Sequence, residues 1–159
     1  MLPCPRCFHV TDAFMSLMLS CHCLALRRAT RAVSNLYDAA LASAGLTVAQ
    51  FAMLQRLRAL GPVNISHAAR AMQLDRTTLG RNLGPLERDA MIRIIASETD
   101  GRQRVIVLTD RGRQAMQQAI PAWKSAQAAI ETRFDGARLA LLHDLLAELE
   151  TAAAQPAAA

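Results

Sequence analysis

Two short helical patterns joined by a tight link constrain this chain more than any other feature. Asn64 is a residue type that caps helix starts, and the residues after it predict a short helix over Ile65–Met72. After the brief connection Gln73-Leu74, Asp75 caps a second helix that we expect to run to about Ala90. Two short helices with so tight a link predict a helix-turn-helix.

A β-hairpin pattern follows the second helix directly. The segments Ile92–Ala96 and Arg104–Leu108 are rich in β-branched residues, and the polar turn between them has Asp100-Gly101 at its centre. A helix-turn-helix followed at once by a hairpin with basic residues near its tip predicts a winged helix.

Helical patterns also precede this unit. Apolar residues at three- and four-residue spacing predict a long amphipathic helix over Cys21–Ala44. Thr47 and Gln50 then form a capping box, which opens a helix that ends at Leu60 before Gly61-Pro62.

Two more helices are expected after the hairpin. Thr109 caps a long helix that should reach Phe134 and bend at Pro121, and Asp135 caps a last one. The last helix carries a row of leucines: Leu139, Leu142, Leu145, Leu146 and Leu149. Neither this helix nor the first has an obvious place to bury its apolar face in so small a core. We therefore expect a homodimer built from the first helix and the last two.

The length of 159 residues suits one folded domain, which we expect over residues 21–150. Residues 1–20 are expected to be an extension, either disordered or upstream of a true start at Met15 or Met18, and residues 151–159 a flexible tail. The predicted fold is mainly α with a small β-hairpin wing: a winged helix-turn-helix with flanking dimerisation helices.

Charge is distributed unevenly along the chain. Of 18 basic residues only Lys124 is not arginine, and the formal net charge is +5. The segment from Arg70 to Arg113 contains nine arginines and six acidic residues. The segment Glu131–Glu150 contains five acidic residues and two arginines. The middle of the chain therefore suits an anionic partner and its end does not.

Several functional classes are disfavoured. The sequence has no glycine-rich phosphate loop, no nucleophile elbow and no HExxH motif. We therefore expect that the protein is not an enzyme and binds no cofactor. No apolar run is long enough for a membrane span, so the expected location is the cytoplasm.

Two stretches carry a family resemblance. DRTTLGRNLGPLERDAMI (75–92) and TDGRQRVIVLTDRG (99–112) resemble the recognition helix and wing of winged helix-turn-helix transcriptional regulators of the MarR family. The order of elements is similar over about residues 21–150. The resemblance implies a DNA-binding regulator, more often a repressor, acting as a homodimer on double-stranded DNA.

The residues that would contact DNA lie on the second short helix and the hairpin. An α-helix fits the major groove, and side chains on its first turns reach base edges or phosphates. The resemblance further implies that Asp100 braces Arg102, which enters the minor groove, and that Arg104 contacts a phosphate. The helix residues assigned to this role are Arg76, Thr77, Thr78, Arg81 and Asn82.

All four cysteines lie within the first 23 residues. The stretch from Cys23 to Tyr37 resembles the first helix of the organic-hydroperoxide-sensing branch, where a reactive cysteine precedes a tyrosine by this spacing. Arg27 and the start of a helix are surroundings that stabilise a thiolate. Arg27 and Val48 occupy places where that branch has further tyrosines. Cys21, Cys23 and Tyr37 are therefore candidates for redox sensing.

Other uses of the cysteines stay open. Cys4, Cys7, Cys21 and Cys23 include enough soft ligands for zinc or another thiophilic ion. Cys21 and Cys23 are also small residues that suit packing at a dimer interface. The expected mechanism is release from a palindromic operator by cysteine oxidation or by a small aromatic ligand. A metal-responsive regulator and a winged-helix adaptor for protein contacts are the alternatives.

Overall fold

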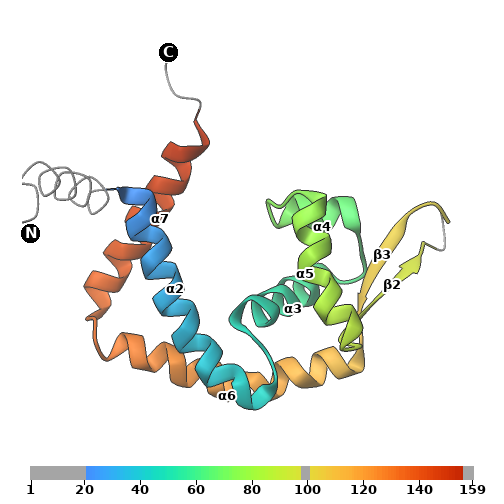
Figure 1. Cartoon of the computed structure of the whole chain (residues 1–159), viewed down its shortest axis with the longest axis horizontal. Coiled ribbons are helices and arrows are strands. Elements are labelled where there is room, and N and C mark those ends of the chain that lie inside the picture. Colours follow the sequence, from blue (N-terminus) through green and yellow to red (C-terminus); the bar gives the residue numbers. More distant parts are fainter. Residues whose placement is uncertain (1–20, 98–100, 156–159) are drawn as a thin grey trace, which may run out of the picture.

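The computed structural model describes residues 21–97 and 101–155. Figure 1 shows a bent chain with a winged lobe at one end and an arm of helices at the other. In chain order the elements are α2 (His22–Leu41), the 3₁₀ turn η1 (Ala42–Ala44), α3 (Val48–Leu60), β1 (Val63–Asn64), α4 (Ile65–Ala71), α5 (Arg76–Arg88), β2 (Ile92–Ala96), β3 (Arg104–Leu108), α6 (Asp110–Glu131) and α7 (Gly136–Ala154).

Five helices begin at the caps that the sequence predicts. In each, the side-chain oxygen of the N-cap residue accepts a hydrogen bond from the backbone N–H three residues later, which satisfies a donor with no partner inside the helix. The caps are Thr47, Asn64, Asp75, Thr109 and Asp135. The mainly helical fold with a small β wing is confirmed.

The hairpin strands coincide with the predicted segments, but the sheet has three strands. β2 and β3 pair antiparallel with Ile92 opposite Leu108 and Ala96 opposite Arg104. β1, which the sequence did not predict, adds to the other side of β3 with Val63 opposite Ile106. Two residues are too few to show an alternating pattern, so this pairing appears only in the folded chain.

The core lies in the lobe, between the sheet and helices α3 to α6. Each buried leucine or isoleucine stabilises the fold by about 1.5–3 kcal/mol relative to exposure. The largest side chains that are almost completely buried are Leu41, Leu54, Leu57, Leu79, Leu83, Leu86, Ile92, Ile106 and Met116. Burial of Leu79, Leu83 and Leu86 turns the opposite face of α5 outward.

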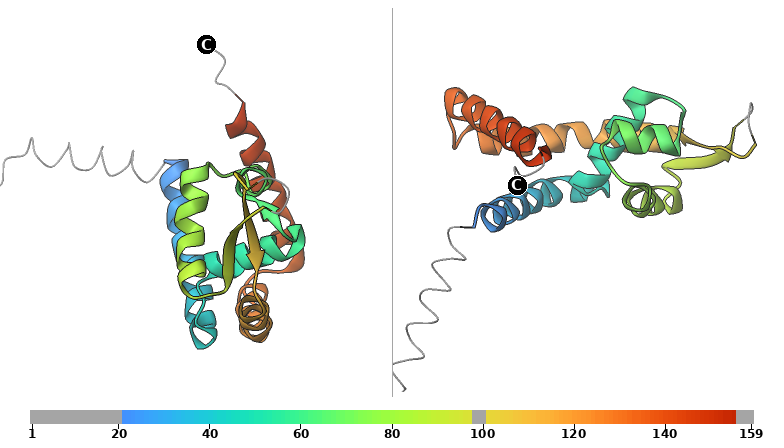
Figure 2. Two further views of the ribbon diagram at one scale, coloured as in Figure 1. Left: turned by 90° about the vertical axis from the view of Figure 1, so that its right-hand side faces the viewer. Right: turned by 90° about the horizontal axis from the view of Figure 1, so that it is seen from above.

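The lobe comprises the elements from α3 to β3 together with the first half of α6. The arm comprises α2, the second half of α6 and α7. The first half of α6 packs under the rest of the lobe, and its second half runs into the arm, where α2 lies along it (Figures 1 and 2). α6 continues through Pro121, so the proline, at which the sequence predicts a bend, does not end the helix. α7 leaves the end of α6 and buries none of its residues.

The end of α7 differs from the sequence prediction, and α6 ends at Glu131 where we had expected it to reach Phe134. We expected a flexible tail from Thr151, but α7 continues through Ala154. The Thr151 hydroxyl donates to the Ala147 carbonyl, and the alanines that follow are strong helix formers. The helix ends at Gln155, which is extended, as a residue before proline prefers to be. No helix in the described ranges is both long and apolar enough to cross a membrane.

Gly112 is the most closely packed glycine among the described residues. A Cβ atom at this position would lie 2.1 Å from the Met91 carbonyl oxygen and 2.8 Å from the Leu108 side chain. A glycine is therefore required where the start of α6 passes beneath the end of the hairpin.

Replacing Gly112 with alanine should destabilise the protein by about 2–3 kcal/mol, because the backbone must move to admit the methyl group. Gly136→Ala is the matched control: it lies at the start of α7 with open space around it and should be neutral or slightly stabilising. Chemical denaturation of both variants measures the difference. Equal stability of the two would show that the contact at Gly112 relaxes freely.

Candidate nucleic-acid interface

Helix α5 presents a polar, basic face to solvent. Four of its five predicted contact residues are exposed, from the first turn to the second: Arg76, Thr77, Arg81 and Asn82. Gly80 and Gly84 lie in open space on the exposed side of the same helix, so nothing screens its backbone there. This face can approach a nucleic acid closely.

Thr78, the fifth predicted contact, is engaged within the protein. Its hydroxyl donates to Asp75 Oδ2 at 2.6 Å, and its backbone N–H donates to Asp75 Oδ1 at 2.9 Å. These two hydrogen bonds hold the pKa of the Asp75 carboxyl below its usual value, the hydroxyl having the larger effect. The half-buried Thr78 therefore orients the start of α5, and its proton is not available to DNA in this arrangement.

Arg76 also has a partner, which sequence reasoning missed. Its Nη2 donates to the Ser66 hydroxyl at 2.9 Å, so the first residue of α5 is tied to the second residue of α4. Both side chains are exposed. The only sequence signal for this pair was a serine in the first turn of the preceding helix.

The wing brings further arginines beside this pair. Arg102 and Arg104 are exposed and line a groove of about 630 Å³ together with Ser66 and Arg76. Asp100, predicted to brace Arg102, lies outside the described residues. The structure thus places Arg102 and Arg104 of the wing and the first arginine of α5 around one groove.

The redox candidates Cys23 and Tyr37 are separated in this structure. Cys21 is the half-buried N-cap of α2, and Cys23 is exposed in the first turn of the helix; both are free thiols. Fourteen residues of helix span about 21 Å, so Tyr37 cannot reach Cys23 of the same chain. Cys23 instead lines a groove between α2 and α7 with Arg27 and Arg31.

Tyr37 joins two helices of the arm, α2 and the second half of α6. It is buried, and its hydroxyl donates to Gln127 Oε1 on α6. Burial first, and the Glu131 carboxylate second, raise the pKa of Tyr37 above its ordinary value of 10.0. The next residue, Asp38, accepts a hydrogen bond from the Val48 backbone N–H at 2.6 Å and so holds the start of α3.

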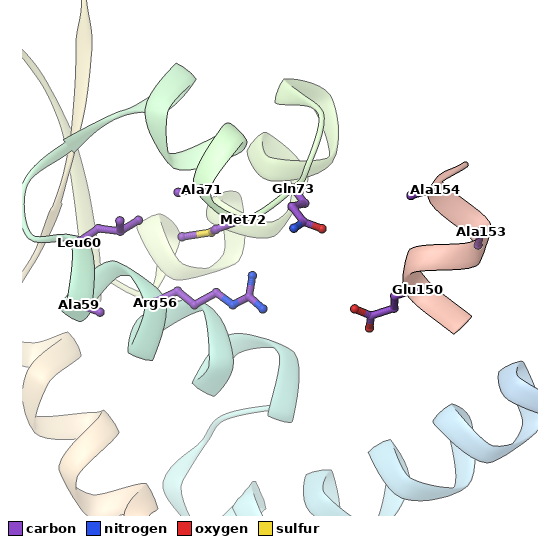
Figure 3. Close-up of a pocket in the computed structure, with 9 residues that line it drawn as sticks. All are labelled: Arg56, Ala59, Leu60, Ala71, Met72, Gln73, Glu150, Ala153 and Ala154. Atoms are coloured by element: carbon purple, nitrogen blue, oxygen red, sulfur yellow. The ribbon is translucent and has the colours of Figure 1, made fainter. Parts of the chain in front are cut away.

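A cleft separates the end of α7 from the helix-turn-helix. It has a volume of about 790 Å³ and lies between α3, the α4–α5 turn and α7 (Figure 3). Figure 3 shows the Arg56 and Glu150 side chains pointing toward each other across it, with Leu60 and Met72 on the lobe side. A charged pair beside an apolar wall is a setting for a small amphipathic ligand.

The described residues contain no cluster of three histidine, cysteine or acidic side chains that could hold a metal ion. Cys4 and Cys7, the other predicted ligands, lie outside those residues.

Comparison with known proteins identifies relatives of the chain. A family model for the MarR family matches residues 44–103. No protein in the curated set of sequences matches the chain. Among solved structures, the chain is 34% identical to the M. tuberculosis transcriptional regulator MosR in complex with DNA, over 86% of this chain and 100% of that chain, with a TM-score of 0.71.

Two further structures are similar. The transcriptional repressor CouR bound to a 23-mer DNA duplex is 25% identical, covers 84% of this chain and 95% of its own, and has a TM-score of 0.74. A probable transcriptional regulator from Pseudomonas aeruginosa is 24% identical over 83% of this chain and 98% of its own, with a TM-score of 0.74. At that identity the last likeness bears on the fold alone.

Tyr37 is the only tyrosine of the chain, so its titration can be followed directly by tyrosinate absorbance. We expect it to ionise above pH 10 in the folded protein and at about 10 in denaturant. A raised pKa in the folded state means that the contribution of Tyr37 to stability is complete below pH 10 and is lost as the pH rises further.

Tyr37→Phe removes the bond to Gln127 and should cost about 1 kcal/mol of stability at neutral pH. The variant should also lose less stability than the wild type between neutral and alkaline pH. Titration at the same pH in the folded and denatured chains would contradict the buried joint.

Proposed function

The chain belongs to the MarR family of transcriptional regulators, and we propose that it represses transcription by binding duplex DNA as a homodimer. The observation that carries this proposal is the exposed basic surface formed by α5 and the wing. With Arg81 and Asn82 on the helix and Arg102 and Arg104 on the wing, it has the side chains that bind guanine, adenine and phosphate.

The proposed docking follows from the shapes of the two elements. α5 enters the major groove, where Arg81 can pair with a guanine and Asn82 with an adenine or a phosphate. The wing reaches the adjacent minor groove with Arg102, because negative potential concentrates there. CouR, a repressor bound to a duplex, supports this reading for a chain of the same fold.

The arm supports a second copy of the chain as the partner. Leu141 and Leu145 of α7 are 58% and 52% exposed, and Leu24 and Val33 of α2 are also exposed. Large apolar side chains gathered on two neighbouring helices mark an interaction surface. A two-fold dimer covers them and spaces two copies of α5 for successive major grooves, which requires a palindromic operator.

Charge favours pairing between α2 of one copy and α7 of the other. The first half of α2 carries Arg27, Arg28 and Arg31 and no acidic residue, whereas α7 carries Asp144, Glu148 and Glu150. Opposite charges on the two helices help to set the register of such an interface.

Two signals are proposed for release from DNA. A small aromatic acid can occupy the cleft of Figure 3, with its carboxylate on Arg56 and its ring against Leu60 and Met72. Alternatively, a peroxide oxidises the Cys23 thiolate to a sulfenic acid and is itself reduced to an alcohol or water. Cys21 then condenses with the sulfenic acid to a disulfide and releases water.

Both proposed signals act in grooves that are lined by α7. The cleft lies between α7 and the lobe, and the Cys23 groove lies between α2 and α7. A change at either place alters the angle between arm and lobe, and with it the spacing of the two α5 helices.

The first test is binding of the purified protein to a duplex from upstream of its own gene, at two salt concentrations. Affinity should fall steeply as salt rises, because arginine–phosphate contacts release counterions. Cumene hydroperoxide should weaken binding and a reductant should restore it. The double variant Cys21→Ser/Cys23→Ser should bind equally well with and without the oxidant.

Other outcomes point to other functions. Oxidant-insensitive binding in the wild type would remove the cysteines from the mechanism and leave the ligand cleft. Salt-insensitive interaction with a protein, with no DNA binding, would favour the adaptor. Absence of DNA binding under every condition would contradict the proposed function.

The dimer is tested by Leu145→Asp, which places a carboxylate in the proposed interface. The variant should sediment as a monomer, and its affinity for DNA should fall at least tenfold because two half-sites are no longer bound together. Ala49→Asp, at an exposed position in the first turn of α3, is the matched control and should remain dimeric. A dimeric Leu145→Asp variant would place the interface elsewhere.

A further inference from the structure

The groove between the start of α5 and the wing lies where a strand of DNA must pass. It is lined by Ser66 and Arg76 on the helix side and by Arg102 and Arg104 on the wing side. β3, which carries Arg104, packs against α4, and α5 packs against β2, so these walls are held at a fixed separation. Figure 1 shows α5 and the hairpin side by side at the end of the molecule away from α7.

The geometry of B-DNA gives this groove a definite occupant. The major and minor grooves are separated by one sugar–phosphate strand on each side. If α5 lies in the major groove and the wing in the adjacent minor groove, that strand crosses between them. Ser66, Arg76 and Arg104 then face phosphates, whereas Arg102 continues into the minor groove.

The hydrogen bond to Ser66 restrains the position of the Arg76 guanidinium. A guanidinium has five N–H donors in a fixed fork, and one of those on Nη2 is used by the Ser66 hydroxyl at 2.9 Å. The hydrogen bond restrains a long, exposed side chain that would otherwise sample many rotamers. The remaining donors stay available for a phosphate in the groove.

We propose that Ser66 is a positioning residue that holds Arg76 as a clamp on the sugar–phosphate strand between the two DNA grooves. Arg76 then contributes affinity without sequence preference, whereas Arg81, one turn further along α5, contributes preference. This inference rests on the proposed DNA-binding function and specifies which residue of that interface binds backbone.

The test is a double-mutant cycle with Ser66→Ala, Arg76→Ala and the combined variant. Affinity is measured for the duplex from upstream of the gene and for a scrambled duplex of equal length, over a series of salt concentrations. Ser66→Thr keeps the hydroxyl and serves as the conservative variant. Arg58→Ala, which removes an exposed arginine of α3 outside the groove, controls for net charge, and Ser43→Ala controls for loss of an exposed hydroxyl.

Arg76→Ala should weaken binding to both duplexes by the same factor, about tenfold, and reduce the salt slope by about 2 per dimer, one phosphate for each subunit. Ser66→Ala should weaken both by about threefold, and Ser66→Thr should restore wild-type affinity. In the absence of Arg76, Ser66→Ala should have no further effect. The two controls should change affinity less than twofold, and thermal unfolding should confirm that every variant is folded.

Three results would overturn the inference. Additive effects of the two substitutions would show that Ser66 does not act through Arg76. A loss confined to the upstream duplex would make Arg76 a base-reading residue, and no loss in Arg76→Ala would remove it from the interface. In each case the wild type still binds DNA in a salt-dependent way, so the proposed function survives; if the wild type binds neither duplex, the proposed function fails as well.

Discussion

The burial of one leucine face of α5 is the constraint on which the interface depends. Leu79, Leu83 and Leu86 are almost completely removed from water and pack in the same cluster as Ile92 and Ile106 of the hairpin. Rotation of α5 about its axis would expose them at a cost of several kcal/mol. The same contacts therefore orient the polar face of α5 and fix its distance from the wing. The groove between α5 and the wing is therefore a consequence of how the core packs.

Much of this arrangement could be predicted from local sequence, because its signals are local. A cap and the backbone N–H that it binds are three residues apart, and a hairpin needs only two β-branched segments and a turn. The interactions that sequence reasoning missed join residues across elements. Tyr37 and Gln127 meet from α2 and α6, and Ser66 and Arg76 meet across the helix-turn-helix link. Patterns of periodicity report which face of a helix is buried, not which residue on another element it meets.

Tyr37 shows how the two kinds of information differ. Its spacing from Cys23 suggested a redox pair, but position along one helix separates them by about 21 Å. In the structure, the Tyr37 hydroxyl donates to Gln127 of α6 within the arm, and Asp38 accepts from the Val48 backbone N–H at the start of α3 in the lobe. Of these two residues, Asp38 is the one that ties the arm to the lobe. Cys23 and Tyr37 both lie on α2, Cys23 at its start and Tyr37 near its end.

Asp75 places a carboxylate at the start of α5, the helix that should approach phosphates. Its hydrogen bonds reduce the repulsion that this negative charge would cause. The two hydrogen bonds from Thr78 stabilise its ionised form, and the N-terminus of α5 adds a favourable dipole. The Thr78 donors and the helix N-terminus therefore offset part of the negative charge of Asp75 in the protein without DNA. The arginines on either side, Arg76 and those of the wing, then dominate the potential that a phosphate meets. Removal of the cap would increase the net positive charge and still loosen the first turn of α5, which carries Arg76 and precedes the turn that carries Arg81. Order in this turn, and not the number of charges alone, makes the basic surface suited to duplex DNA.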